Sequence, residues 1–132
     1  MGKEGEGCFE VDTRTAKSQL RALLKLVEKS GAHVRKIVVF GSHAKGLATK
    51  ISDLDVCLIF ADDVAKGPDI TAKIRYQLGR LNLNIDLSSL YSSELRHNKL
   101  SCFVNEIKTT SISAEDFLKR APKTLDAESK SA

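Results

Sequence analysis

Apolar and polar residues alternate along the chain with the period of a helix in some segments and of a strand in others. The first helical segment follows Asp12 or Thr13, either of which can cap a helix, and runs to about Lys29. The pair Ser30-Gly31 is typical of a helix end. Apolar residues recur three and four positions apart and define one buried face: Ala16, Leu20, Leu23, Leu24 and Val27.

Two continuous apolar runs have the length and the β-branched composition of buried strands. They cover residues 36–40 and residues 53–60. Between them, residues 43–47 favour a short helix or helical turn. Apolar and polar residues alternate over residues 83–87, which predicts a third strand with Asp86 on its polar face.

Further helices are predicted in the second half of the chain. The helix breaker at residues 67–69 starts one that continues to about Leu81. Ser92 or Ser93 can cap the next helix, and residues 113–116 are a plausible start for a last one. The buried stripe of the helix after Ser93 is expected to be Leu100, Phe103, Val104 and Ile107.

This order of elements predicts one domain of the α/β (α+β) class, in which helices pack on a small mixed sheet. A chain of 132 residues is long enough for one substantial core and too short for two. We expect the domain to span residues 12–120, with residues 1–11 as a flexible N-terminus and residues 121–132 as a disordered tail.

Composition narrows the class of protein further. The apolar runs are too short to span a membrane, and the first residues lack the apolar core of a signal peptide, so we expect a cytoplasmic protein. Three widely spaced cysteines are typical of free thiols in a reducing compartment. The net charge of +4 favours approach to nucleotides or RNA, but no long basic run argues for a nucleic-acid partner.

The chemistry of the sequence is concentrated in one motif. The first apolar run ends in Gly41-Ser42, and ten residues later Asp53 and Asp55 open the second run. Gly41 lets the backbone turn tightly beside a phosphate, and Ser42 offers a hydroxyl. The N–H groups that follow begin a helix, whose N-terminus attracts anions. Lys45, one helical turn further on, can reach the same phosphates.

The aspartates of this motif predict a metal site. Strand side chains alternate between faces, so Asp53 and Asp55 point the same way, about 7 Å apart. Carboxylates this close repel each other unless a cation is present, and Mg²⁺ prefers such oxygen ligands. If the third strand lies beside the second, Asp86 can complete a three-carboxylate site, and it can also accept the proton of an attacking hydroxyl. The alternative is that all three are solvated aspartates of strands.

The segment from Gly41 to Asp55 resembles the signature of the polymerase-β-type nucleotidyltransferase superfamily. The short chain is most similar to the minimal nucleotidyltransferase branch, over roughly residues 14–90. This resemblance implies that the Gly-Ser pair holds a nucleoside triphosphate, that the two aspartates of the motif bind Mg²⁺, and that Asp86 is the third acidic residue. The branch often has arginine where this chain has Lys45, which keeps the charge but loses the two-pronged phosphate grip.

Three functions are compatible with these features. The first is a Mg²⁺-dependent nucleotidyltransferase that moves a nucleoside monophosphate from a nucleoside triphosphate to an acceptor hydroxyl. Many members of the branch are partners of HEPN-domain toxins, so the resemblance implies transfer of AMP from ATP to such a toxin. The others are a non-catalytic nucleotide-binding antitoxin and an RNA-directed nucleotidyltransferase. We expect the acceptor groove to come from a partner chain or a dimer mate.

Two further side chains have a functional and a structural interpretation. His43 follows the turn and can contact phosphate, but we expect a surface histidine. Cys57 lies in the second strand, and we expect a small core residue instead of a nucleophile because nothing nearby in the sequence would activate the thiol.

Overall fold

The computed structural model describes residues 15–49, 52–97 and 100–120. The expectations for residues 1–11 and 121–132 lie outside this part of the chain. In chain order the elements are α2 (Ala16–Ser30), β1 (Val34–Phe40), α3 (Gly41–Lys45), β2 (Leu54–Phe60), α4 (Gly67–Arg80), β3 (Ile85–Tyr91), α5 (Ser92–His97), α6 (Cys102–Thr110), β4 (Ile112–Ser113) and α7 (Ala114–Lys119).

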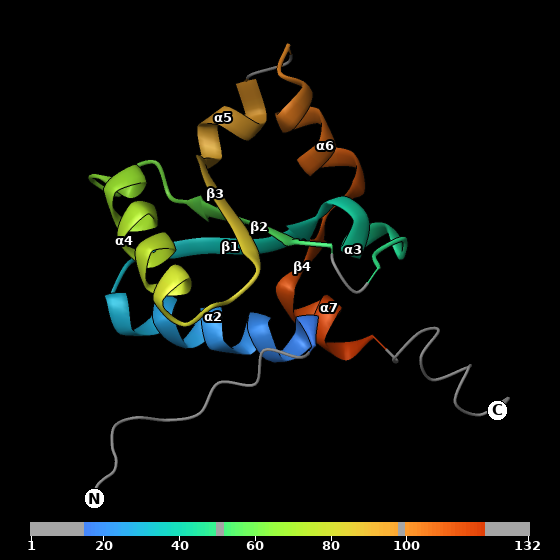
Figure 1. The fold of residues 1–132 in the computed structure, drawn as a ribbon. Coiled ribbons are helices and arrows are strands. Elements are labelled where there is room, and N and C mark those ends of the chain that lie inside the picture. Colours follow the sequence, from blue (N-terminus) through green and yellow to red (C-terminus); the bar gives the residue numbers. More distant parts are fainter. Residues whose placement is uncertain (1–14, 50–51, 98–99, 121–132) are drawn as a thin grey trace, which may run out of the picture.

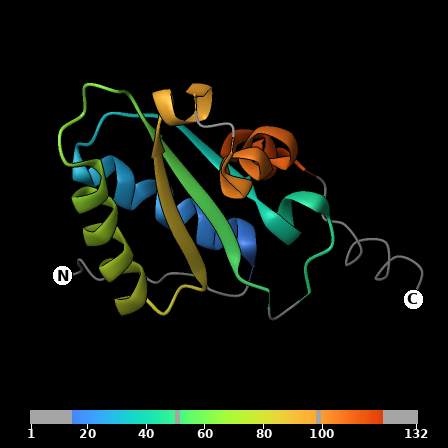
Figure 2. The same cartoon turned by 90° about the horizontal axis from the view of Figure 1, so that it is seen from above.

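The strands form one mixed sheet in the order β3-β2-β1-β4. β1 is antiparallel to both of its neighbours, β2 and β4, whereas β2 and β3 are parallel. Helices cover both faces of the sheet: α2, α4 and α7 lie on one side, and α5 and α6 lie on the other (Figure 1). The view from above shows β2 crossing the middle of the molecule (Figure 2). The predicted α/β class with a small mixed sheet is confirmed.

Strand β2 is the centre of the core because both of its faces are covered. One set of its side chains packs in the cluster that includes α2, α4 and α7: Leu54, Val56, Leu58 and Phe60. Cys57 and Ile59 point to the opposite face and pack with residues of α6. Asp55 is the only residue of β2 that is not buried. Burial raises the pKa of the Cys57 thiol to about 11, so Cys57 is the core residue that the sequence predicted.

The ends of α2 differ in how well the sequence predicted them. The helix begins at Ala16 with Thr15 as its N-cap, whose hydroxyl accepts a backbone hydrogen bond from the first turn. The predicted caps, Asp12 and Thr13, were therefore placed too early. At the other end Gly31 adopts φ 72° and terminates the helix, as predicted.

The expectation of one helix after Ser93 was wrong, because two separate helices, α5 and α6, occupy this region. α6 has its own N-cap, Ser101, whose hydroxyl accepts a hydrogen bond from the Val104 N–H at 3.1 Å. Val104 and Ile107 are buried as predicted. Leu100 is 95% exposed, because it precedes the cap of α6 and does not belong to the helix.

Strand pairing corrects the other predicted boundaries. β1 begins at Val34, before residue 36, and β3 continues past Leu87 to Tyr91, because each pairs with β2 along its length. The short helix α3 begins directly at Gly41. The two-residue strand β4 was not predicted, but the start of α7 was. Ser113 caps α7 by accepting a hydrogen bond from the Asp116 N–H.

Within the described residues, no helix is both long and apolar enough to cross a membrane.

Tyr91 attaches the start of α4 to the end of the sheet. Its hydroxyl donates a hydrogen bond to the Val64 carbonyl oxygen and accepts one from the Gly67 N–H, each at 3.0 Å. Its ring packs against Phe60, with 6.1 Å between the ring centroids. The N-cap position of α4, Lys66, provides no side-chain cap, so the Tyr91 hydroxyl takes over this role.

We predict that Tyr91→Phe lowers the free energy of unfolding by about 1–2 kcal/mol, because it leaves the Gly67 N–H without its acceptor. Urea denaturation measures the change. Tyr76→Phe is the matched control, since Tyr76 is 67% exposed and its hydroxyl should contribute less than about 0.5 kcal/mol. Equal losses in the two variants would contradict the assigned role.

Candidate active site

The site begins where β1 passes directly into α3. Gly41 has φ +71°, a conformation that other residues adopt only with strain. A Cβ atom at this position would lie 2.2 Å from Oδ2 of Asp55. Gly41 is therefore required twice, for the turn of the backbone and for the close approach of α3 to the Asp55 carboxylate. Gly46 ends α3 with φ 78°.

Parallel pairing of β2 with β3 brings two of the predicted aspartates together. Asp55 and Asp86 are register partners, and neighbouring strands lie about 4.8 Å apart, so the two side chains share one face. Asp53 immediately precedes β2. Asp53 and Asp86 are exposed, whereas Asp55 is half-buried. The condition on which the three-carboxylate hypothesis depended, that the third strand lies beside the second, is met.

The aspartates act on one another electrostatically. The pKa of the Asp55 carboxyl is raised, first by burial and then by the negative charges of Asp86, Asp53 and Glu106, while His43 acts in the opposite direction. Among the described residues, no hydrogen-bond donor or ion-pair partner contacts any of the three aspartates. Half-buried carboxylates are normally hydrogen-bonded or paired, so this cluster is suited to a cationic ligand.

The residues fit Mg²⁺ by their chemistry, although they do not form a ready-made coordination site. In the part of the chain that the structure describes, no group of three or more His, Cys, Asp or Glu side chains is arranged to hold a metal ion. The three candidate ligands are nevertheless all carboxylates, and oxygen donors are what Mg²⁺ prefers. The Asp55 carboxylate itself occupies the position that a Cβ of residue 41 would take. Metal binding by Asp53, Asp55 and Asp86 stays a prediction.

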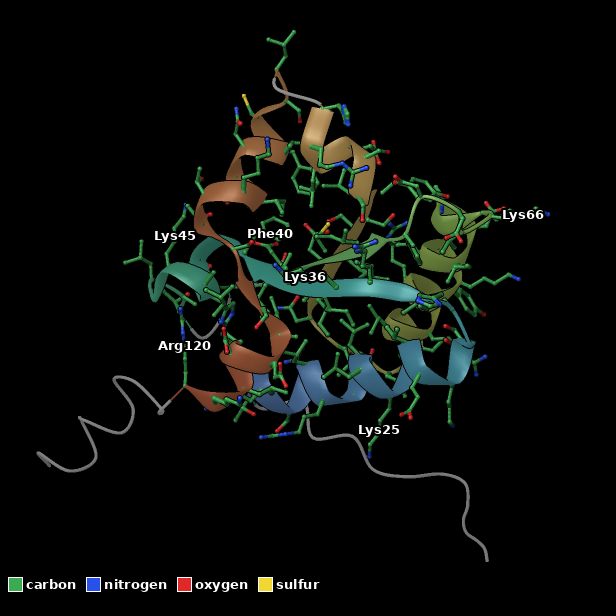
Figure 3. All side chains as sticks on the ribbon, turned by 180° about the vertical axis from the view of Figure 1, so that it is seen from behind. Lys25, Lys36, Phe40, Lys45, Lys66 and Arg120 are labelled. Carbon is green, nitrogen blue, oxygen red and sulfur yellow. The ribbon has the colours of Figure 1, made fainter. Side chains whose placement is uncertain are left out.

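The two remaining candidate residues both lie on α3 but differ in their surroundings. Ser42 is half-buried, and its hydroxyl forms no hydrogen bond within residues 15–49, 52–97 and 100–120. It is therefore available to a ligand. Lys45 is exposed, and its Nζ lies 3.9 Å from Oε2 of Glu106 on α6. Figure 3 shows Lys45 at the outer side of α3. The cation predicted to reach phosphates is thus paired with a residue of α6.

His43 is not the surface residue that the sequence suggested. It is half-buried, with Nε2 3.2 Å from the carbonyl oxygen of Ser52, the residue before Asp53. Its ring meets the Phe117 ring edge to face, with 6.2 Å between centroids. Sequence reasoning missed Glu106 and Phe117 as neighbours of the site, because α6 and α7 are far from the motif in sequence and only the tertiary fold brings them close.

Asp55→Asn tests the electrostatic description of the cluster. Because the pKa of Asp55 is raised in the folded state, its protonated form stabilises the fold at low pH, and this contribution is lost as the pH rises through the raised pKa. Without divalent ions, we predict that Asp55→Asn is more stable than the wild type at pH 7 and that the difference closes toward pH 3.

Urea denaturation at several pH values measures this difference. Asp63→Asn is the matched control, because Asp63 is exposed in the turn after β2 and should change stability by less than about 0.5 kcal/mol. A difference between Asp55→Asn and the wild type that does not depend on pH would rule out a raised pKa of Asp55 in the folded state.

Comparison with known proteins agrees with this geometry. The family model described as "Nucleotidyltransferase domain" matches residues 20–119, which include the Gly-Ser pair and all three aspartates. The fold is similar to a crystal structure of a toxin–antitoxin complex with AMP-PNP, at 18% identity and a TM-score of 0.50, covering 88% of this chain and 89% of the other. It is also similar to a crystal structure of a mutant of the toxin–antitoxin pair MntA-HpeT, at 17% identity and a TM-score of 0.50, covering 84% and 87%.

No curated protein sequence matches the chain. The two structural similarities concern the fold, whereas the family model covers most of the chain and contains the whole candidate site. As the motif predicted, this chain belongs to the nucleotidyltransferase domain family.

Proposed function

We propose that the chain is a Mg²⁺-dependent nucleotidyltransferase that moves AMP from ATP to a hydroxyl group of a partner protein. The observation that carries the proposal is the register pairing of Asp55 with Asp86, directly beside the Cβ-free surface of Gly41. Family membership supports nucleotidyl transfer in general. The AMP-PNP in one complex of similar fold supports ATP as the donor.

A toxin is the acceptor that we favour. Both structures of similar fold are toxin–antitoxin complexes, and the sequence motif resembles a branch whose members accompany HEPN-type toxins. Asp53 and Asp86 are exposed, so an acceptor carried by a second protein can approach the cluster from solvent.

In this proposal the carboxylates of Asp53, Asp55 and Asp86 hold Mg²⁺. When bound, the metal neutralises charge that develops on the α-phosphate and on the leaving pyrophosphate. Asp55 is half-buried, whereas the other two are exposed, so it is the carboxylate that gains most from a cation, because it is the most desolvated of the three.

Residues of α3 bind the rest of the nucleotide. The Ser42 hydroxyl donates to the β- and γ-phosphates, and the turn at Gly41, with φ 71°, presents Ser42 at the start of α3. The Lys45 ammonium group adds positive charge once its ion pair with Glu106 is broken. Exposed ion pairs contribute about 0.2–1 kcal/mol, and the Lys45 and Glu106 side chains are 45% and 36% exposed. A triphosphate can therefore compete for Lys45.

The transfer step needs a proton acceptor and a leaving group. The acceptor oxygen attacks the α-phosphorus while the bond from that phosphorus to the oxygen bridging the β-phosphate breaks, and pyrophosphate leaves. A carboxylate oxygen of Asp86 accepts the proton of the attacking hydroxyl. Asp86 is suited to this because it lies at the edge strand β3 and is exposed.

Label transfer from ATP tests the proposal. The chain is incubated with Mg²⁺ and with candidate acceptor proteins, beginning with the product of the neighbouring gene, and with ATP labelled at either the α- or the γ-phosphate. We predict label on the acceptor from α-³²P-ATP only. Asp53→Ala should reduce the rate by about 100-fold or more, and chelation of divalent ions should abolish transfer.

Asp63→Ala is the matched control, since it removes the same charge from an exposed turn close to the site in sequence. Equal labelling by the wild type and by Asp53→Ala would overturn the proposed site. Tight binding of the partner by the wild type, without transfer of any label, would favour the non-catalytic antitoxin over the enzyme.

A further inference from the structure

Helix α3 is too short to hold its own position. It has only five residues, Gly41–Lys45, whereas isolated helices shorter than about 12 residues are marginal in water. Yet it carries Gly41, Ser42 and Lys45, and its placement decides where a nucleotide would lie. The N–H groups of Gly46 and Leu47 cap its His43 and Ser42 carbonyls. These bonds are local, so contacts from elsewhere in the fold must fix the position of α3.

Arg120, which is distant from α3 in sequence, supplies such contacts. It follows α7, and its guanidinium donates through Nη1 to the His43 carbonyl oxygen at 3.1 Å and through Nη2 to the Ala44 carbonyl oxygen at 2.7 Å. Figure 3 shows Arg120 between α7 and α3. The planar guanidinium fork suits two adjacent carbonyl acceptors, and a lysine does not reproduce it.

Arg120 is itself held on both sides. Its guanidinium carbon lies 5.8 Å from the centroid of the Phe117 ring, a distance at which a cation is attracted to the ring face. Its carbonyl oxygen accepts a hydrogen bond from the ammonium of Lys17 on α2. Phe117 is 6% exposed and belongs to the main core cluster, so the contacts on α3 are anchored in the core.

A second set of contacts extends the same support to the metal side of the site. Phe117 packs against the ring of His43, and His43 reaches the carbonyl oxygen of Ser52 at 3.2 Å. Ser52 directly precedes Asp53. Phe117 of α7 therefore supports, through the His43 ring, the segment that leads to Asp53, whereas Arg120 supports the backbone of α3.

We propose that Arg120 is a positioning residue: it fixes α3 relative to Asp55 and thereby sets the affinity for the nucleotide. Arg120 acts through the backbone of His43 and Ala44. The carboxylates on β2 and β3 are placed by strand pairing instead, so loss of Arg120 affects nucleotide binding more than the chemical step. The effect on the nucleotide rests on the proposed function, whereas the effect on α3 does not.

The experiment compares Arg120→Met, Arg120→Lys and Arg75→Met. Arg75 is the matched control, because it also donates two hydrogen bonds to a backbone carbonyl, from Nε at 3.2 Å and Nη2 at 3.0 Å to Leu87, but does so on β3. Amide hydrogen exchange is measured first, without nucleotide. The N–H groups of Gly46 and Leu47, which bond to the His43 and Ser42 carbonyls of α3, should exchange at least about tenfold faster in Arg120→Met, a change of about 1.4 kcal/mol.

Kinetics then test the consequence for the nucleotide. We predict that Arg120→Met raises KM for ATP about tenfold, equivalent to about 1.4 kcal/mol, and leaves kcat within about twofold. Arg120→Lys should restore part of the affinity, because it keeps one charged donor. Arg75→Met should leave both KM and the exchange of Gly46 and Leu47 as in the wild type.

Two results would overturn the inference. One is that the Gly46 and Leu47 amides exchange in Arg120→Met as in the wild type. The other is that KM for ATP rises no more in Arg120→Met than in Arg75→Met when the two variants have lost the same free energy of unfolding. If the wild type itself transfers no label, the proposed function fails alone, and hydrogen exchange still decides whether Arg120 holds α3.

Discussion

Parallel pairing of β2 with β3 is the constraint on which the candidate site depends. It makes the carboxylates of Asp55 and Asp86 neighbours, and Asp53 adds a third. The fold tolerates this because the remaining residues of β2 are buried on both faces. Burial of one aliphatic or aromatic side chain contributes about 1.5–3 kcal/mol to stability. The buried apolar residues of β2 therefore stabilise the fold by more than the repulsion at the half-buried Asp55 destabilises it.

The same arrangement explains why the site lies at the beginning of β2. Helices cover both sheet faces along the strand, whereas Asp53 is exposed and Asp55 half-buried at its beginning. There β1 turns into α3, and the missing side chain of Gly41 lets that helix contact Asp55. Residues of α6 and α7 complete the surroundings through Glu106 and Phe117. The site is thus built from both halves of the chain, although its motif occupies one short segment.

The sequence predicted those parts of the fold and site that depend on local patterns. Alternation of apolar and polar residues placed Asp86 on the open face of its strand, and the Gly-Ser turn was located correctly because only glycine adopts φ +71° without strain. Sequence reasoning did not recognise the break between α5 and α6, because no glycine or proline marks it and the capping Ser101 resembles any other serine. Nor did it predict β3 beyond Leu87, since pairing with β2 overrides the polar character of Ser88.

Tertiary contacts account for what no local pattern reveals. His43 has the sequence environment of a surface histidine, and its burial depends on Phe117 and Ser52. Lys45 has the spacing of a phosphate ligand, yet Glu106 on α6 competes for its charge. Both cases concern residues of α3, whose five residues are governed by their neighbours more than by their own sequence.

A crystal structure with Mg²⁺ and a non-hydrolysable ATP analogue tests the central claim most directly. We predict a metal ion at about 2.0–2.1 Å from carboxylate oxygens of Asp53, Asp55 and Asp86, with the triphosphate against Gly41 and Ser42. A nucleotide bound elsewhere, or a metal ion held without these aspartates, would contradict it.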